Sequence, residues 1–161
     1  MRAAAAVLAL VLLCGCSGTT RGRNRTNAAA PSGTAGEEEG KAALNKIPAQ
    51  DRLAFVQIGV AAGNLRSSAA LIRIQNKVPE SDTTTFRALA RNVASLHPRD
   101  PLLQRLRRWT ARELKRAIEA RRSLRAARRS VATTLAGVDR ITEGLRAYVF
   151  VHPEIGALVP D

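Results

Sequence analysis

Apolar residues recur at helical spacing along most of the chain after Pro48. Between Ala49 and about Lys77 they form two neighbouring stripes, which together make a wide apolar face. The first stripe holds Phe55, Ile58, Ala62, Leu65, Ala69 and Ile72, and the second holds Leu53, Val56, Val60, Gly63, Ala70 and Ile74. A face of this width predicts a helix that contacts more than one neighbour.

Small residues recur within this predicted helix, where Gly59, Gly63 and Ser67 stand four residues apart. A glycine inside a helix costs about 1 kcal/mol relative to alanine. We therefore predict that Gly59 and Gly63 lie where a second backbone comes close. Glycines that are merely tolerated in an alanine-rich helix would give the same sequence.

A second helix is predicted after Val78-Pro79, because the residue before a proline is driven out of the helical region. Ser81 or Asp82 can cap its start. Its apolar positions are Phe86, Leu89, Ala90, Val93 and Leu96, and His97-Pro98 closes it.

A third helical segment opens with Asp100-Pro101, a capping residue followed by proline at the first helical position. Alternating steps of three and four from Leu103 to Tyr148 meet apolar residues at eleven of fourteen positions, which is a heptad seam. We assign to helix packing Leu106, Trp109, Leu124, Val131, Val138 and Leu145, with an interfacial membrane anchor as the alternative role for Trp109.

The length of this third segment leaves two arrangements open. A continuous helix over residues 102–150 would extend roughly 73 Å, far beyond the first helix. Either it projects and finds a partner, or it bends, with Ser130 and Gly137 as the candidate positions.

The predicted fold class is all-α: a helical bundle or hairpin with one long C-terminal heptad-patterned helix, preceded by a disordered tether. Composition agrees, because alanine, leucine and valine supply most of the apolar residues and aromatic residues make up only 3%. At 161 residues the chain has room for one such domain.

The N-terminus begins with Met1 and Arg2, followed by an unbroken apolar run from Ala3 to Leu13. This run is too short to span a bilayer, which needs roughly 20 apolar residues. Its length is typical of the hydrophobic region of a signal peptide.

Leu13-Cys14-Gly15-Cys16 resembles the lipobox of bacterial lipoprotein precursors, although cysteine at position 14 departs from the usual small residue. The resemblance covers residues 1–16 and implies that Cys16 is lipidated after removal of a signal peptide, residues 1–15. Ser17, in place of a retention-type aspartate, implies the outer membrane facing the periplasm, with the inner membrane as the alternative. An ordinary cleavable signal, with the two cysteines incidental or redox-paired, is the competing interpretation.

Four regions follow from these patterns. After the signal peptide, residues 16–46 are rich in small and polar residues and predict a lipidated flexible tether, with a reach of roughly 30 Å. Residues 47–152 form the helical domain. Residues 153–161 form a C-terminal tail that either folds back to cap the bundle or docks elsewhere.

Charge is the chain's most unusual property, with 26 basic and 13 acidic residues and a formal net charge of +13. Eleven basic residues crowd one stretch: Arg105, Arg107, Arg108, Arg112, Lys115, Arg116, Arg121, Arg122, Arg125, Arg128 and Arg129. On a single helix they would leave the sector of Leu106, Trp109 and Leu124 free of charge. They are either a solvated exterior or a surface for anionic lipid or lipopolysaccharide. Nucleic acid would satisfy the charge, but the exported location argues against it.

The sequence offers little for catalysis. His97 and His152 each precede a proline at the end of a helical segment, and no known catalytic or phosphate-loop motif occurs. Cys14 and Cys16 have no further cysteine to complete a zinc site. We therefore predict a protein that is not an enzyme and holds no metal or cofactor.

These inferences predict a lipid-anchored periplasmic helical protein that acts by binding. As a structural or accessory envelope lipoprotein, it would self-associate or dock another envelope protein. The alternative is a peripheral binder of anionic lipid or lipopolysaccharide through a basic helix face.

Overall fold

The computed structural model describes residues 42–158, all of which belong to one compact unit, Gly33–Asp161. A short helical turn over residues 42–45 precedes the elements α2 (Ala49–Gln75), α3 (Asp82–Ser95), α4 (Pro101–Ala120), α5 (Leu124–Val151) and the 3-10 helix η1 (Pro153–Leu158). The described residues contain no strand, so the predicted all-α bundle is confirmed. The signal peptide, Cys16 and the tether up to residue 41 lie outside the described residues.

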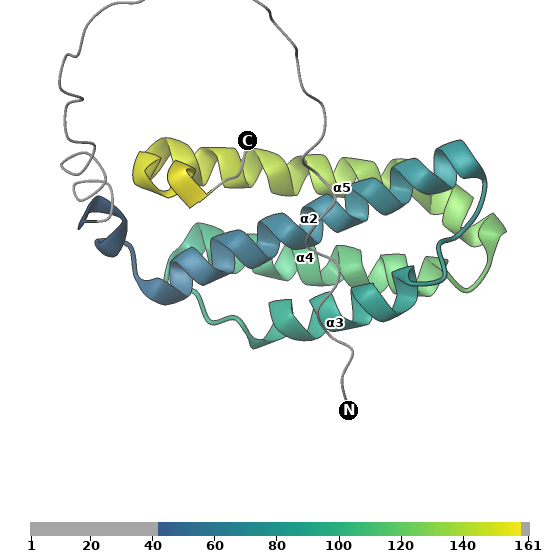
Figure 1. The fold of residues 1–161 in the computed structure, drawn as a ribbon, viewed down its shortest axis with the longest axis horizontal. Helices are drawn as coiled ribbons and strands as arrows, with labels where there is room; N and C mark the ends of the chain where they lie inside the picture. Colours follow the sequence, from purple (N-terminus) through teal and green to yellow (C-terminus); the bar gives the residue numbers. More distant parts are fainter. Residues whose placement is uncertain (1–41, 159–161) are drawn as a thin grey trace, which may run out of the picture. The chain divides into compact units, whose positions relative to one another are not determined.

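The four long helices run alternately up and down beside one another (Figure 1). Helix α5 packs along both α2 and α4, and α4 also packs against α3. Every helix contributes to one apolar core, whose largest fully buried side chains include Ile58, Phe86, Leu106 and Ile141. Since this core closes within residues 47–155, a chain that begins at Gly33 retains all of it.

The helix boundaries follow the predicted signals closely. Helix α2 starts after Pro48 and ends at Gln75. The residue that caps its C-terminus, Asn76, adopts a left-handed conformation with φ of 52°. The Asp100 carboxylate accepts the amide N–H groups of Leu102 and Leu103 at 2.8 and 3.1 Å, with Pro101 at the first helical position. The capping role predicted for Asp100 is confirmed.

The single long heptad-patterned helix over residues 102–150, one of the two arrangements left open by the sequence, does not form. Helix α4 ends at Ala120, and Ser123 caps α5 by accepting the amide N–H of Ala126 at 3.2 Å. The chain reverses between them, and the two candidate bend positions, Ser130 and Gly137, lie inside α5. The two halves of the heptad seam, one on α4 and one on α5, therefore pack against each other within a single chain.

A buried polar cluster holds this reversal against the rest of the bundle. Arg121, the C-cap residue of α4, has a side chain only 1% exposed. Its Nε donates to Asp82 Oδ2 at 3.3 Å, and its Nη2 donates to Ser68 Oγ at 2.5 Å. Ser68 in turn donates to Asp82, and the guanidinium lies 5.1 Å from the centre of the Phe86 ring. The cluster thus joins α2, α3 and the α4–α5 turn.

The glycine prediction needs correction as well. Gly63 is exposed with no atom near the position of an added Cβ, and at Gly59 the nearest atom is Leu145 Cδ1, 4.0 Å away. The close approaches occur instead at Gly137 and Gly144 of α5. A Cβ at Gly144 would overlap Leu106, and one at Gly137 would lie 2.6 Å from Glu113 Cδ. The tight helix contact is α4 against α5.

The described part of the C-terminal tail, residues 153–158, folds back onto the bundle, which is one of the two predicted arrangements. Helix η1 packs against α5, and Ile155 is fully buried in the common core. The Ile155 amide donates to the carbonyl of His152 at 3.0 Å. Beside it, Tyr148 is buried between Phe55 and His152, with ring centres 5.8 and 4.6 Å away.

Breaking the Arg121 cluster should destabilise the bundle strongly. Burial lowers the pKa of Arg121, while the hydrogen bond and charge of Asp82 raise it. Replacing Arg121 by Met leaves Asp82 without its cation, so we expect a loss of about 3–5 kcal/mol in the free energy of unfolding, measured by urea denaturation. The matched variant Arg122→Met, at the exposed neighbouring position, should change stability by less than about 0.5 kcal/mol. Equal effects of the two variants would contradict the cluster's role.

Replacement by alanine should have opposite effects on stability at the exposed Gly63 and at the closely packed Gly144. Gly63→Ala gains helix propensity without a steric conflict and should stabilise the protein by up to about 1 kcal/mol. Gly144→Ala should destabilise it by about 1 kcal/mol, because overlap with Leu106 outweighs the same gain. Thermal denaturation of the two variants tests the assignment, and stabilisation by both would refute a tight contact at Gly144.

Tyr148, the only tyrosine of the chain, should lose its phenolic proton at a higher pH than an ordinary tyrosine does. Burial raises its pKa to about 12, with further contributions from the carboxylates of Asp100 and Asp51. Between pH of about 10 and 12 the unfolded chain therefore loses a proton that the folded protein keeps, so stability should fall as pH rises. Phenolate absorbance measures the titration directly, and Tyr148→Phe should weaken the alkaline loss of stability. A midpoint near pH 10 in the folded protein would contradict this account.

Candidate functional site

The eleven basic residues predicted to form one surface are divided by the structure. Arg121 is removed from it, since its side chain is buried in the cluster with Asp82 and Ser68. Arg107 is half-buried and donates to the backbone carbonyl of Leu96. The remaining nine are exposed: Arg105, Arg108, Arg112, Lys115, Arg116, Arg122, Arg125, Arg128 and Arg129.

The exposed basic residues follow the outer sides of two antiparallel helices and the turn between them. On α4 they recur at steps of three and four, opposite the buried row of Leu103, Leu106, Thr110, Leu114 and Ala117. On α5 they occupy the first turns, beside the exposed Arg122. The single-helix arrangement predicted from the sequence is therefore replaced by a basic face that passes around one end of the α4–α5 hairpin.

Several acidic side chains are turned inward, which makes the surface more positive than composition alone indicates. Residues 42–158 contain 21 basic and nine acidic side chains, a formal net charge of +12. Asp51 is buried and accepts the Arg99 amide at 2.6 Å, while Asp82 is buried against Arg121. Asp100 caps α4.

Few of the eleven basic residues have an acidic partner. Within the described part of the chain, Arg116 pairs with Glu113 at 2.8 Å and Arg121 pairs with Asp82, and these are the two ion pairs in that group. Arg107 donates to the Leu96 carbonyl, and the remaining eight side chains of the group are exposed to solvent or an external anion.

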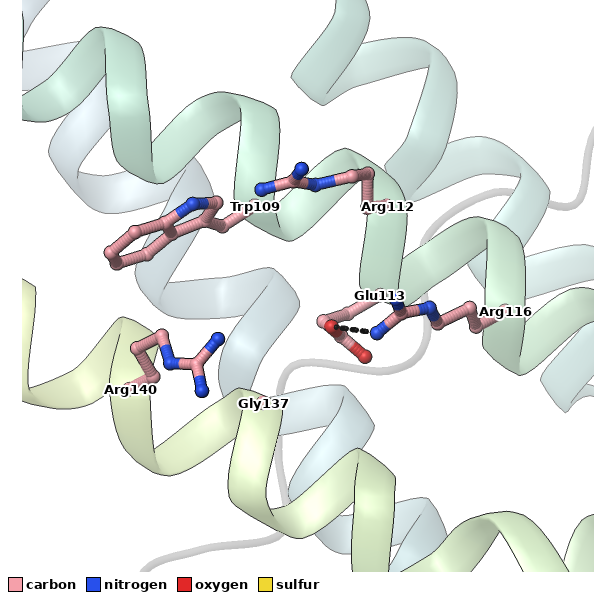
Figure 2. A pocket seen from close by; sticks show the side chains of 6 residues that line it. All are labelled: Trp109, Arg112, Glu113, Arg116, Gly137 and Arg140. Atoms are coloured by element: carbon pink, nitrogen blue, oxygen red, sulfur yellow. Dashed lines mark hydrogen bonds and ion pairs between the residues drawn. The ribbon is translucent and has the colours of Figure 1, made fainter.

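A hollow of about 150 Å³ opens between α4 and α5 (Figure 2). It is lined by Trp109, Arg112, Glu113, Arg116, Gly137 and Arg140. The guanidinium of Arg140 lies 5.8 Å from the centre of the Trp109 ring. Sequence reasoning missed Arg140, because only the reversal of the chain brings α5 beside Trp109.

Two further hollows border α4. Arg107 and Arg108 line both of them, one of about 210 Å³ with His97, Pro98 and Gln104, and one of about 380 Å³ with Ala94, Ala111 and Arg112. A groove of about 400 Å³ lies between α2 and α5 and is lined by Ile72, Arg73, Asn76, Arg128, Val131, Ala132 and Leu135. Arg128 lines this groove and none of the three hollows that border α4.

The structure buries some of the residues predicted for helix packing and leaves others half-buried or exposed. Leu106 and Val138 are buried in the core, and Trp109 and Leu145 pack against it half-buried, as predicted. Val131 is half-buried and lines the groove between α2 and α5. Leu124 is exposed at the start of α5, because the reversal at residues 121–123 takes it out of the seam.

Exposed apolar side chains occur elsewhere on the surface. They are Leu53, Val60, Leu71 and Ile74 on α2, Leu124 at the start of α5, and Phe150 and Val151 at its end. None of the described helices is long and apolar enough to cross a bilayer. Among the described residues no cluster of three or more potential metal-binding side chains occurs.

In comparisons with protein families, curated proteins and solved structures, no match to the chain was found.

Proposed function

We propose that this protein is a lipid-anchored envelope protein that binds an anionic membrane surface through the exposed basic residues of α4 and α5. The observation that carries the proposal is the separation of charge within the fold. Acidic Asp51 and Asp82 are buried, whereas nine of the eleven basic residues in the stretch from Arg105 to Arg129 are exposed. A surface of this kind attracts phosphate-bearing headgroups.

The internal position of the heptad seam favours this function over self-association. Leu106 and Val138, at the centre of the seam, are fully buried within one chain. The centre of the seam is therefore not available to a second copy. The basic stretch, in contrast to the centre of the seam, keeps nine of its eleven residues exposed.

The proposal combines a lipid anchor with an electrostatic contact. Acyl chains on Cys16 would hold the chain to the outer membrane on its periplasmic face, or to the inner membrane, and the basic face would bring the folded domain to the same surface. Each basic residue near an anionic surface contributes about 1 kcal/mol, so four or five of them would contribute about 4–5 kcal/mol. This is sufficient to keep the domain against the bilayer instead of at the end of its tether.

A second candidate is the docking of another envelope protein, favoured by the exposed apolar side chains of α2. Leu53, Val60 and Ile74 are separated by multiples of seven residues, which places them on one side of the helix, with Leu71 beside them. Such a row fits the apolar face of a partner helix. Val60→Lys and Ile74→Lys should then abolish cross-linking to that partner while leaving vesicle binding intact.

Vesicle co-sedimentation of the chain that begins at Gly33 tests the membrane proposal. We expect binding to vesicles that contain anionic lipid, weak binding to neutral vesicles, and loss of binding as salt rises. The triple variant Arg105→Gln, Arg108→Gln, Arg112→Gln should weaken binding about 100-fold, from about 1 kcal/mol for each charge.

The matched control removes the same charge from elsewhere on the unit, with Arg87→Gln, Arg91→Gln and Arg99→Gln at exposed positions on α3 and the loop after it. It should retain most of the binding. Equal losses in the two triple variants, or equal binding to neutral and anionic vesicles, would contradict the proposed face.

A further inference from the structure

We propose that the hollow between α4 and α5 is a binding site for a phosphate monoester group. This inference rests on the proposed function, because it identifies the headgroup chemistry that the basic face would select. The shared ligand chemistry is a terminal phosphate, carried either by a membrane lipid or by a soluble molecule.

Arginine side chains from two helices line this hollow. Arg112 and Arg116 come from α4 and Arg140 comes from α5. Figure 2 shows Arg116 turned toward Glu113, whose carboxylate lies between Arg116 and Arg140, and Arg112 extended toward Trp109. Planar guanidinium groups suit phosphate oxygens because each can donate two parallel hydrogen bonds.

The charge of the hollow matches a monoester better than a diester. Three arginines and the single carboxylate of Glu113 give it a formal charge of +2. A phosphate monoester carries about −1.5 to −2 at neutral pH, whereas a diester carries a single negative charge. The Coulomb attraction therefore favours a terminal phosphate over the linking phosphate of an ordinary phospholipid.

Two neighbours hold the arginines in place while leaving donors for a ligand. Glu113, whose side chain is 12% exposed, accepts from Arg116 Nη1 at 2.8 Å, and Arg116 itself is 62% exposed. Arg140 is held over the face of Trp109. Because a guanidinium has five N–H donors, these contacts leave most of them free for an anion.

Gly137 makes this arrangement sterically feasible. A Cβ there would lie 2.6 Å from Glu113 Cδ, so the glycine lets the carboxylate pack against the α5 backbone. Glu113 and Gly137 are thus positioning residues for Arg116. The hollow's volume of about 150 Å³, roughly five waters at about 30 Å³ each, is larger than one phosphate group and leaves room for it.

Trp109 is the only tryptophan in the chain, so its fluorescence reports directly from the hollow. The full chain in neutral detergent is titrated with inorganic phosphate, glycerol phosphate and dimethyl phosphate, with chloride at matched ionic strength as the reference. We expect a saturable change with the first two ligands. The diester should bind at least about tenfold more weakly because it carries less charge.

Variants identify the residues that hold the phosphate. Arg112→Gln and Arg140→Gln should each weaken the phosphate response at least about tenfold, since each removes a charge-assisted contact. Arg108→Gln on the same helix does not line this hollow and should change it less than about twofold. No saturable response, or equal losses in Arg108→Gln and Arg140→Gln, would overturn the proposal.

Vesicles then separate the two sources of phosphate. The full chain is reconstituted into vesicles containing phosphatidic acid, a monoester lipid, or phosphatidylglycerol, a diester lipid, at equal surface charge. A fluorescence change specific to phosphatidic acid, lost in Arg140→Gln, supports a lipid headgroup. A response to soluble phosphate without this lipid preference supports a soluble ligand in the same hollow.

The two proposals can fail separately. If the Gly33 chain binds anionic vesicles but Trp109 responds to no phosphate, the hollow is not a site and the membrane function stands. If vesicle binding fails while the fluorescence response persists in the full chain, the hollow binds phosphate and the membrane function is wrong.

Discussion

The ion pair between Arg121 and Asp82 is the interaction on which the rest of the structure depends. It is buried at the point where the chain reverses from α4 into α5, and Ser68 connects it to α2. Buried pairs of this kind add little net stability compared with apolar replacements, but removing one partner is costly. The pair therefore acts mainly on the arrangement of the helices, since it is satisfied only when the turn lies over both α2 and α3.

This reversal determines which residues reach the surface. Once α4 and α5 lie side by side, Leu106 of α4 and Val138 of α5 are both buried in the core, and the centre of the apolar seam becomes internal. The same reversal leaves the exposed arginines along the outer sides of two helices and brings Arg140 next to Trp109. The basic face and the hollow are thus consequences of one turn, and the proposed binding role uses what the turn leaves exposed.

Local signals in the sequence predicted the helices well because they act over a few residues. Asp100-Pro101 marks the start of α4, and the two apolar stripes of α2 include the buried Ile58 and Leu65. The sequence does not reveal the turn at residues 121–123, because the heptad pattern continues across it and because arginines at these positions are typical of an exposed helix surface. The hydrogen-bond partners of Arg121, Asp82 and Ser68, lie 39 and 53 residues away along the chain, so no local sequence pattern predicts that Arg121 is buried. Gly59 and Gly63 were chosen for their spacing, whereas close contact at Gly144 depends on where Leu106 arrives after the reversal.

The distance between α4 and α5 in solution tests the account most directly. The chain that begins at Gly33 contains no native cysteine, so Arg105→Cys and Arg146→Cys place two spin labels at exposed positions near the paired residues Leu106 and Gly144. With labelled protein diluted in unlabelled protein, the closed hairpin predicts a short distance between the labelled backbones, close to the roughly 8–10 Å that separates packed helix axes. A continuous helix would place the same positions about 60 Å apart. A distance distribution centred near that longer value would contradict the closed hairpin, and with it the basic face and hollow that depend on the reversal.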